Sequence, residues 1–242
     1  MSVSKQLLRI LAVILAIVIC LSALFFVAIL HVDKIVMFSV SRFSGMQVSY
    51  GAKKGNSLTS VHIKDLEVDS PKTGLAVDSE NAVFRIRWSE LFAEKKLVID
   101  CQFEGVRFHA GSGTSGIGSS MDALIKVPLG SKWKYRVITF TITADKNRVS
   151  IRPFDAISSD VVVVGGCDYS PDSGDAVLDV HMSFSPDVSA GLMENGGQIF
   201  LTPENDGWYG AALSLEGNLK SGSFHMKSDR IEINIREVAP SS

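Results

Sequence analysis

The side chains that most often carry chemistry are scattered along this chain. Its five histidines are His31, His62, His109, His181 and His225. None of them has a second histidine or a cysteine at the spacing of a zinc site. His62 and His181 fall on the polar positions of alternating segments, so we interpret them as surface imidazoles. We therefore expect no metal site.

One glycine-rich segment matches the pattern of a nucleotide-binding loop, but its surroundings do not. Residues 111–116 read GSGTSG, which fits G-x-G-x-x-G. A dinucleotide loop opens a helix and meets an acid about 20 residues later, whereas more Gly and Ser follow here, and residues 130–135 contain no acid. We interpret residues 111–120 as a flexible connector. The chain also lacks a P-loop and a G-x-S-x-G motif, so we expect a non-enzymatic protein without a cofactor.

The charge balance argues against a nucleic-acid partner. The 242 residues include 24 Lys+Arg and 26 Asp+Glu, and only two basic residues, Lys5 and Arg9, precede the first acid. The rest of the chain therefore has 24 − 2 = 22 basic and 26 acidic residues, a net charge of −4. Nucleic-acid binding normally needs a basic surface. Of the three cysteines, Cys101 and Cys167 either form a disulfide in an oxidising compartment or are buried free thiols.

Apolar residues recur at every second position beyond residue 45, which predicts half-buried β-strands. The apolar members of four such segments are Phe84, Ile86 and Trp88; Leu97, Ile99, Cys101 and Phe103; Leu178, Val180, Met182 and Phe184; and Ile231, Ile233 and Ile235. Each set alternates with mainly polar neighbours. These segments predict a sheet with one apolar and one wet face.

Short turns and helical segments complete this prediction. Turn signals occur at residues 70–74, 165–166, 170–174, 195–197, 205–207 and 216–218. Helical turns are expected at 88–95, with Ser89 as the N-cap, and at 121–127 and 187–193. Strands joined by short turns pair antiparallel, so the fold class is mainly β. We favour one continuous sheet over two domains divided by residues 111–120.

A long apolar segment near the N-terminus predicts a membrane anchor. Residues 10–30 contain Ser22 as their only polar side chain, and a helix of this length crosses a bilayer core of about 30 Å. The basic residues before it keep residues 1–9 in the cytoplasm. The alternatives are a cleaved signal peptide and lipidation at Cys20. The predicted plan is a tail (1–9), a transmembrane signal anchor (10–30), a membrane-proximal helical extension (31–44) and a β-rich domain (45–240).

The first half of the chain resembles the AsmA-like superfamily. Residues 58–71 read LTSVHIKDLEVDSP, and WSELFAEKKLVIDCQFEGVRF follows at residues 88–108. Members of the family show an l-x-D-L-x-V-x-x-P phrase, a W-x-x-L helical turn and an L-x-I-x-x-x-x-E-G-V-x-F strand. The resemblance covers residues 5–110. It implies a curled, taco-like antiparallel sheet with an apolar concave face, anchored in the inner membrane and facing the periplasm.

The resemblance also sets the expected function. Large relatives are thought to conduct or shield lipids between membranes or to assist outer-membrane assembly, and a small relative is an accessory component of type II secretion. We expect an apolar groove that binds lipid chains through Phe84, Ile86, Trp88, Leu97, Ile99 and Phe103. Membrane lipid is the expected partner, with other envelope proteins or self-association through sheet edges as further ones. The alternatives are a closed sandwich and an assembly subunit that acts by protein contact.

Overall fold

The computed structural model describes residues 47–57, 59–70, 75–110, 127–194, 196–221, 223–228 and 232–236. Its elements are β1 (Gln47–Asn56), β2 (Ser60–Ser70), β3 (Leu75–Ile86), α3 (Trp88–Glu94), β4 (Leu97–Ala110), β5 (Lys134–Ala144), β6 (Val149–Ile157), β7 (Val161–Tyr169), β8 (Asp175–Phe184), α5 (Pro186–Glu194), η1 (Gly197–Ile199), β9 (Thr202–Pro203), η2 (Asn205–Gly207), β10 (Tyr209–Asn218), β11 (Ser223–Ser228) and β12 (Glu232–Arg236). The predicted mainly β fold is confirmed.

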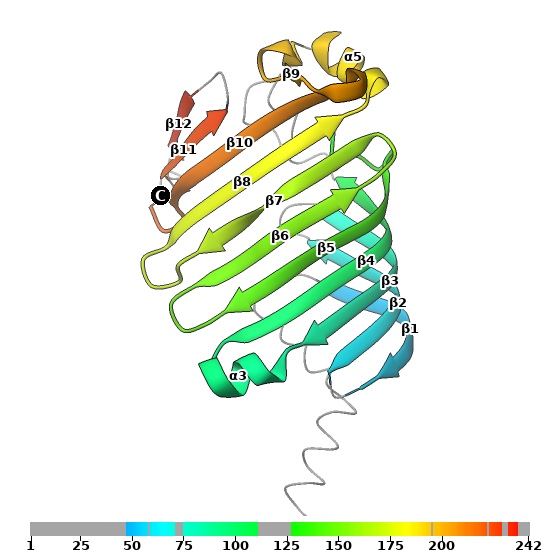
Figure 1. Cartoon of the computed structure of the whole chain (residues 1–242), viewed down its shortest axis with the longest axis vertical. Helices are drawn as coiled ribbons and strands as arrows, with labels where there is room; N and C mark the ends of the chain where they lie inside the picture. The colour runs from blue at the N-terminus through cyan, green and yellow to red at the C-terminus, as the bar shows by residue number, and fades with distance from the viewer. Residues whose placement is uncertain are drawn as a thin grey trace, which may run out of the picture.

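The strands form one antiparallel sheet in chain order (Figure 1). Eleven strands follow one another from β1 to β12, and the short β9 pairs with β10 beside this path. β4 pairs with β5 along most of its length, although residues 111–133 separate the two in sequence. The expectation of one continuous sheet is therefore correct. The predicted connector at 111–120 lies outside the described residues.

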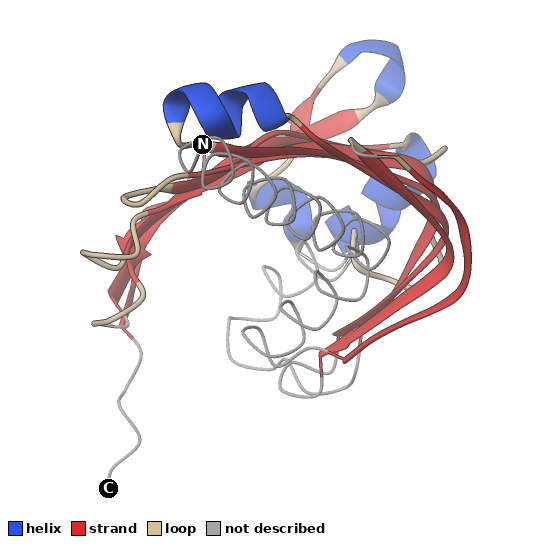
Figure 2. Ribbon diagram, turned by 90° about the horizontal axis from the view of Figure 1, so that it is seen from below, coloured by secondary structure: helices blue, strands red, loops and turns tan. Residues whose placement is uncertain are grey.

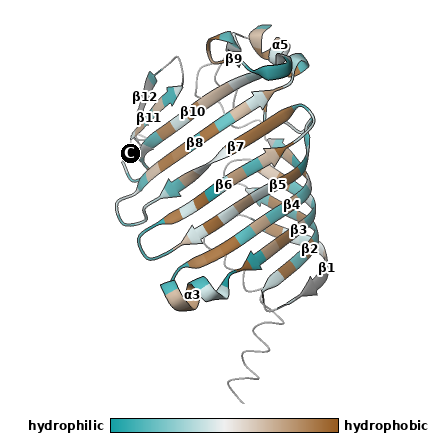
Figure 3. Cartoon of the chain, viewed as in Figure 1, coloured by the Kyte–Doolittle hydropathy of each residue, from teal (hydrophilic) through white to brown (hydrophobic). Residues whose placement is uncertain are grey.

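Hydrophobic and hydrophilic residues alternate along many of the strands (Figure 3). Because alternate residues of a strand point to opposite sides, the sheet has an apolar face and a polar face. Residues paired across neighbouring strands share a face. Thus Phe84, Cys101 and Phe140, which pair in series from β3 to β5, lie on the apolar face. Arg85, Asp100 and Thr141 also pair in series and lie on the polar face.

Viewed from below, the sheet is a single bent layer with two free ends (Figure 2). The bend is not strong, so the structure supports an antiparallel sheet and falls short of the strong curl expected for a taco-like one. The main core lies where α5 and η1 adjoin the sheet. Leu192 of α5, together with Phe200 and Leu201 after η1, joins apolar-face residues such as Val163 and Met182 in one buried cluster.

The two short helices lie where the sequence predicts them, but the predicted N-cap residue is wrong. The helices predicted at 88–95 and 187–193 are α3 and α5. The proposed N-cap Ser89 is wrong, because Arg87 occupies that position and no side chain caps the helix. Arg87 instead binds the Asp100 carboxylate through two hydrogen bonds of 2.8 Å. The segment predicted at 121–127 lies outside the described residues except for Val127, which is in a turn.

Two predicted turns lie inside strands. Gly165 and Gly166 are in the middle of β7, and residues 216–218 are the last part of β10. A Cβ atom at Gly165 would lie 2.1 Å from the Asp179 carbonyl oxygen, and one at Gly166 would lie 2.4 Å from Arg152 Cγ. These glycines therefore allow neighbouring strands to approach more closely than a larger side chain would permit. The turn signal at 170–174 is correct, since this segment joins β7 to β8.

The predicted anchor at residues 10–30 and its extension at 31–44 lie outside the described residues. Within the described ranges, no helix is both long and apolar enough to cross a membrane.

Candidate functional site

The apolar face is the most extended chemical feature of the described structure. Three rows of residues paired in series cross eight strands, from β2 or β3 to β10 or β11, without a polar side chain other than cysteine. The rows are Val61-Phe84-Cys101-Phe140-Phe154-Gly165-Val180-Leu213; Ile63-Ala82-Phe103-Ile138-Ala156-Val163-Met182-Ala211; and Ile86-Ile99-Ile142-Ile151-Cys167-Leu178-Leu215-Met226. Seven strand spacings of about 4.8 Å give each row a length of about 34 Å.

Four phenylalanines on neighbouring strands form an aromatic row on this face. The Phe84 and Phe103 rings meet edge to face with centroids 5.5 Å apart, and Phe103 stacks on Phe140 at 5.5 Å. Phe140 in turn stacks on Phe154 at 6.1 Å. All four side chains are half-buried. The aromatic row therefore offers a continuous, partly accessible apolar surface across β3–β6.

Five of the six residues predicted to line a groove share this face. Phe84 and Ile86 on β3 pair with Cys101 and Ile99 on β4, and Phe103 follows two positions along. Leu97 begins β4 on the same side and is half-buried like the others. Trp88 does not belong to the strand. It is the first residue of α3, and its ring stacks on Phe92.

The sequence reasoning missed Phe140 and Phe154. Phe140 belongs to a regular alternation in β5, where Ile138, Phe140 and Ile142 alternate with threonines, and this pattern was a usable signal. Phe154 had no such signal. The register of β6 shifts between Ile151 and Phe154, so the apolar positions there are three residues apart rather than two.

Cys101 and Cys167 lie on the apolar face as free thiols. Cys101 is on β4 and Cys167 on β7, so three strand spacings, about 14 Å, separate them. A disulfide needs Cα atoms within about 7 Å, so this pair does not form one in this fold. Burial raises the pKa of Cys101 to about 12, helped by the nearby Asp100 charge. Of the two alternatives from the sequence, free thiols describe the structure, with Cys101 buried and Cys167 half-buried.

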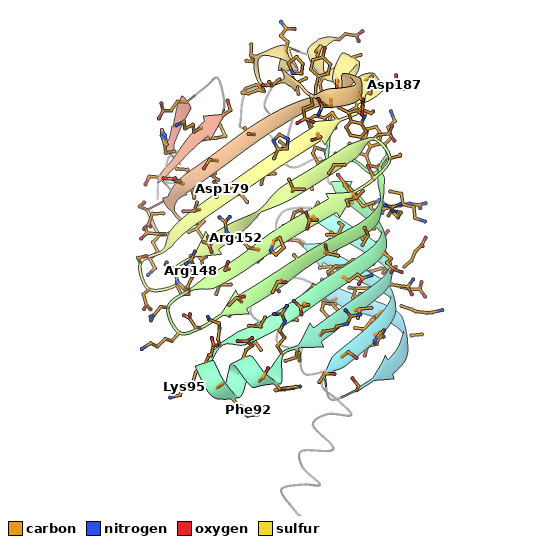
Figure 4. The ribbon with its side chains drawn as sticks, in the orientation of Figure 1. Phe92, Lys95, Arg148, Arg152, Asp179 and Asp187 are labelled. Atoms are coloured by element: carbon orange, nitrogen blue, oxygen red, sulfur yellow. The ribbon has the colours of Figure 1, made fainter. Side chains whose placement is uncertain are left out.

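The polar face carries a charge ladder made of Arg148, Arg152, Asp168 and Asp179. Figure 4 labels Arg148, Arg152 and Asp179. Arg148 and Arg152 each approach Asp168 to 2.9 Å, and Arg152 also reaches Asp179 at 2.8 Å. Burial alone would raise the pKa of Asp168. Its hydrogen bonds with Arg148, Ser150 and Arg152 outweigh that effect and hold the pKa at about 2. The ladder links β6, β7 and β8 and leaves each carboxylate paired.

Two hollows lie on the polar face. One of about 220 Å³ is lined by Arg85, Gln102 and Thr139, and another of about 590 Å³ by His181, Ser214 and Lys227. His181 Nε2 is 2.7 Å from a Glu204 carboxylate oxygen, which ties the segment after β9 to the sheet. Among the described residues, no three His, Cys, Asp or Glu side chains gather closely enough to hold a metal ion.

No protein-family model matches the chain, and no curated protein is found to be related to it. The resemblance to AsmA-like proteins thus remains a prediction from the quoted residues. The functional argument rests on the geometry of the apolar face.

Proposed function

We propose that this protein is a non-enzymatic, single-pass envelope protein whose apolar face binds or shields lipid chains during lipid transport or outer-membrane maintenance. In this proposal residues 10–30 anchor the chain in the inner membrane, with residues 1–9 in the cytoplasm and the sheet in the periplasm. The single observation that carries the proposal is the set of three uninterrupted apolar rows. A catalytic site requires converging polar groups, and this face has none along those rows.

The dimensions of the face suit an acyl chain. A bilayer core of about 30 Å contains two leaflets, so one acyl chain extends about 15 Å. The rows that begin at Val61 and Ile86 are mostly half-buried, whereas the row that begins at Ile63 is almost wholly buried. Each of the two half-buried rows is about 34 Å long, which exceeds the length of such a chain. The half-buried ring surfaces of the aromatic row supply contact area without hydrogen-bonding groups that a methylene chain would leave unpaired. The AsmA-like resemblance implies a stronger curl than this sheet has.

A photoactivatable fatty acid tests the proposal. Cells that express the full chain are fed a diazirine fatty acid, irradiated, and the chain is purified and its adducts mapped by mass spectrometry. We expect adducts on apolar-face positions such as Phe103, Phe140 and Phe154, and also within residues 10–30. Labelling confined to residues 10–30 would support the anchor and refute lipid shielding. Labelling absent from residues 10–30 would refute the anchor.

An assembly subunit that acts by protein contact is the second candidate. Among the described strands, β1 and β12 each pair on one side only, and a free strand edge is a template for adding another strand. β1 is ten residues long, which is enough for a stable strand addition. A photo-crosslinking amino acid at Ser49 of β1, whose hydroxyl is 3.1 Å from Glu67 on β2, tests this candidate in cells. If β1 adds a strand from another chain, the crosslink should recover a defined protein partner or a second copy.

A further inference from the structure

The end of the molecule that carries α3 has an unusual exposed aromatic residue. α3 and α5 lie at opposite ends of the longest axis (Figure 1). Phe92 in α3 is 77% exposed, the highest value among the large apolar residues of the described structure. Its ring stacks on Trp88 one turn earlier, with centroids 6.2 Å apart and planes inclined by 24°. No residue of α3 is buried, so this helix projects from the sheet.

Two lysines, Lys95 and Lys96, follow Phe92 within four residues. Lys95 ends the helix in the left-handed conformation, with φ of 56°. Lys95 and Phe92 both lie at the α3 end of the molecule (Figure 4). Lys96 comes next and is 3.5 Å from Glu94. A Trp–Phe pair beside lysines is the composition typical of a membrane–water interface. There aromatic rings lie at the headgroup level and lysine stems extend along apolar surface to keep their amines in water.

We propose that the α3 end docks on the lipid–water interface of the membrane, with Phe92 and Trp88 among the headgroups and Lys95 and Lys96 at the phosphates. The inference rests on the proposed function, since it takes residues 10–30 as the membrane anchor. Residues 31–46 then link the anchor to β1, and these sixteen residues span at most about 56 Å. β1 is ten residues long, or about 33 Å, which is shorter than the reach of this linker. The linker therefore allows either end of the strands to face the bilayer.

A bilayer fits this surface better than a protein partner does. The Phe92 side chain protrudes from α3 with 77% of its surface exposed, and a protruding ring enters a soft headgroup layer without needing a matching pocket. Glu90 and Glu94 balance the two lysines, so the helix lacks the single-sign field that steers charged protein partners. Zwitterionic and anionic headgroups both suit such a mixture.

Docking here would join the apolar face to the membrane. The chain leaves that face at Ile86, forms α3, and returns to the same face at Leu97. The opposite end is covered by the cluster that contains Leu192 and Phe200. A lipid chain leaving the bilayer at α3 would therefore meet the half-buried Ile86, Leu97 and Ile99 first.

Depth-dependent quenching tests the docking. The full chain is reconstituted in nanodiscs with an environment-sensitive fluorescent amino acid at position 92, and lipids spin-labelled near the headgroup serve as quenchers. Position 219 is the control, because Leu219 is also apolar and 58% exposed but lies in the turn between β10 and β11. We expect quenching about threefold stronger at 92 than at 219. The double variant Lys95→Glu, Lys96→Glu should reduce it in nanodiscs that contain anionic lipid, with an unchanged melting temperature.

Equal or weaker quenching at position 92 would overturn the docking. So would a probe at 92 whose emission shifts only when a protein partner is added. The same nanodiscs with the probe at position 140 separate this inference from the proposed function. Quenching at 92 with none at 140 supports docking and refutes lipid shielding, whereas quenching at 140 alone does the reverse.

Discussion

Asp168 shows how single side chains stabilise the polar face. Its carboxylate lies between Arg148 and Arg152 with only 16% of the side chain exposed, and its pKa of about 2 is below the ordinary value of 3.8. A lowered folded-state pKa means that the stabilisation is present above about pH 4 and is lost as the pH falls towards 2. The difference corresponds to about 2 kcal/mol.

We therefore predict that Asp168→Asn lowers the free energy of unfolding by about 2 kcal/mol at pH 7 and changes it little near pH 2. Urea denaturation of the full chain at both pH values measures this. Asp172→Asn is the matched control, because Asp172 is an exposed acid in the turn between β7 and β8 and should cost much less. An equal loss at both pH values would mean that the substitution acts through packing and not through charge.

At the scale of elements, glycine was the least predictable residue. Gly165 and Gly166 resemble a turn signal in the sequence, yet they lie within β7. Glycine is needed at these positions because neighbouring atoms leave no room for a Cβ. Sequence shows that a glycine is present, and only the assembled sheet shows whether it serves a turn or a close contact. The strands that contain Phe84, Ile99 and Met182 were easier to predict, since their apolar residues follow the two-residue period of a strand. Phe154 escaped because a register shift interrupts that period.

The two uses of glycine predict opposite effects of the same substitution. Gly165→Ala places a methyl 2.1 Å from the backbone oxygen of Asp179, so β7 and β8 must separate, and the free energy of unfolding should fall by about 2 kcal/mol or more. Gly191→Ala in α5 meets no atom within 4 Å and should raise it by about 0.5–1 kcal/mol through helix propensity. Thermal unfolding followed by circular dichroism compares the two. A neutral Gly165→Ala would contradict the close approach of these strands.

At the scale of the whole molecule, the sequence predicted one antiparallel sheet with an apolar face. It could not predict the moderate bend, because bending depends on how register shifts such as those in β5–β6 and β6–β7 add across many strands. It also placed Trp88 on the apolar face, whereas the chain turns into α3 at that residue. Five of the six predicted groove residues still lie together, because side-chain alternation is a local property that survives errors at strand ends.

The central claim is that the apolar face meets lipid chains while the polar face does not. Phe140 and Thr139 are neighbours on β5 with side chains on opposite faces, so they form a matched pair for a photo-crosslinking amino acid. The full chain carrying the probe at either position is irradiated in native membranes, and the adducts are identified by mass spectrometry. We predict lipid adducts from position 140 and few from position 139. Equal yields from both positions, or protein adducts alone from position 140, would contradict the account.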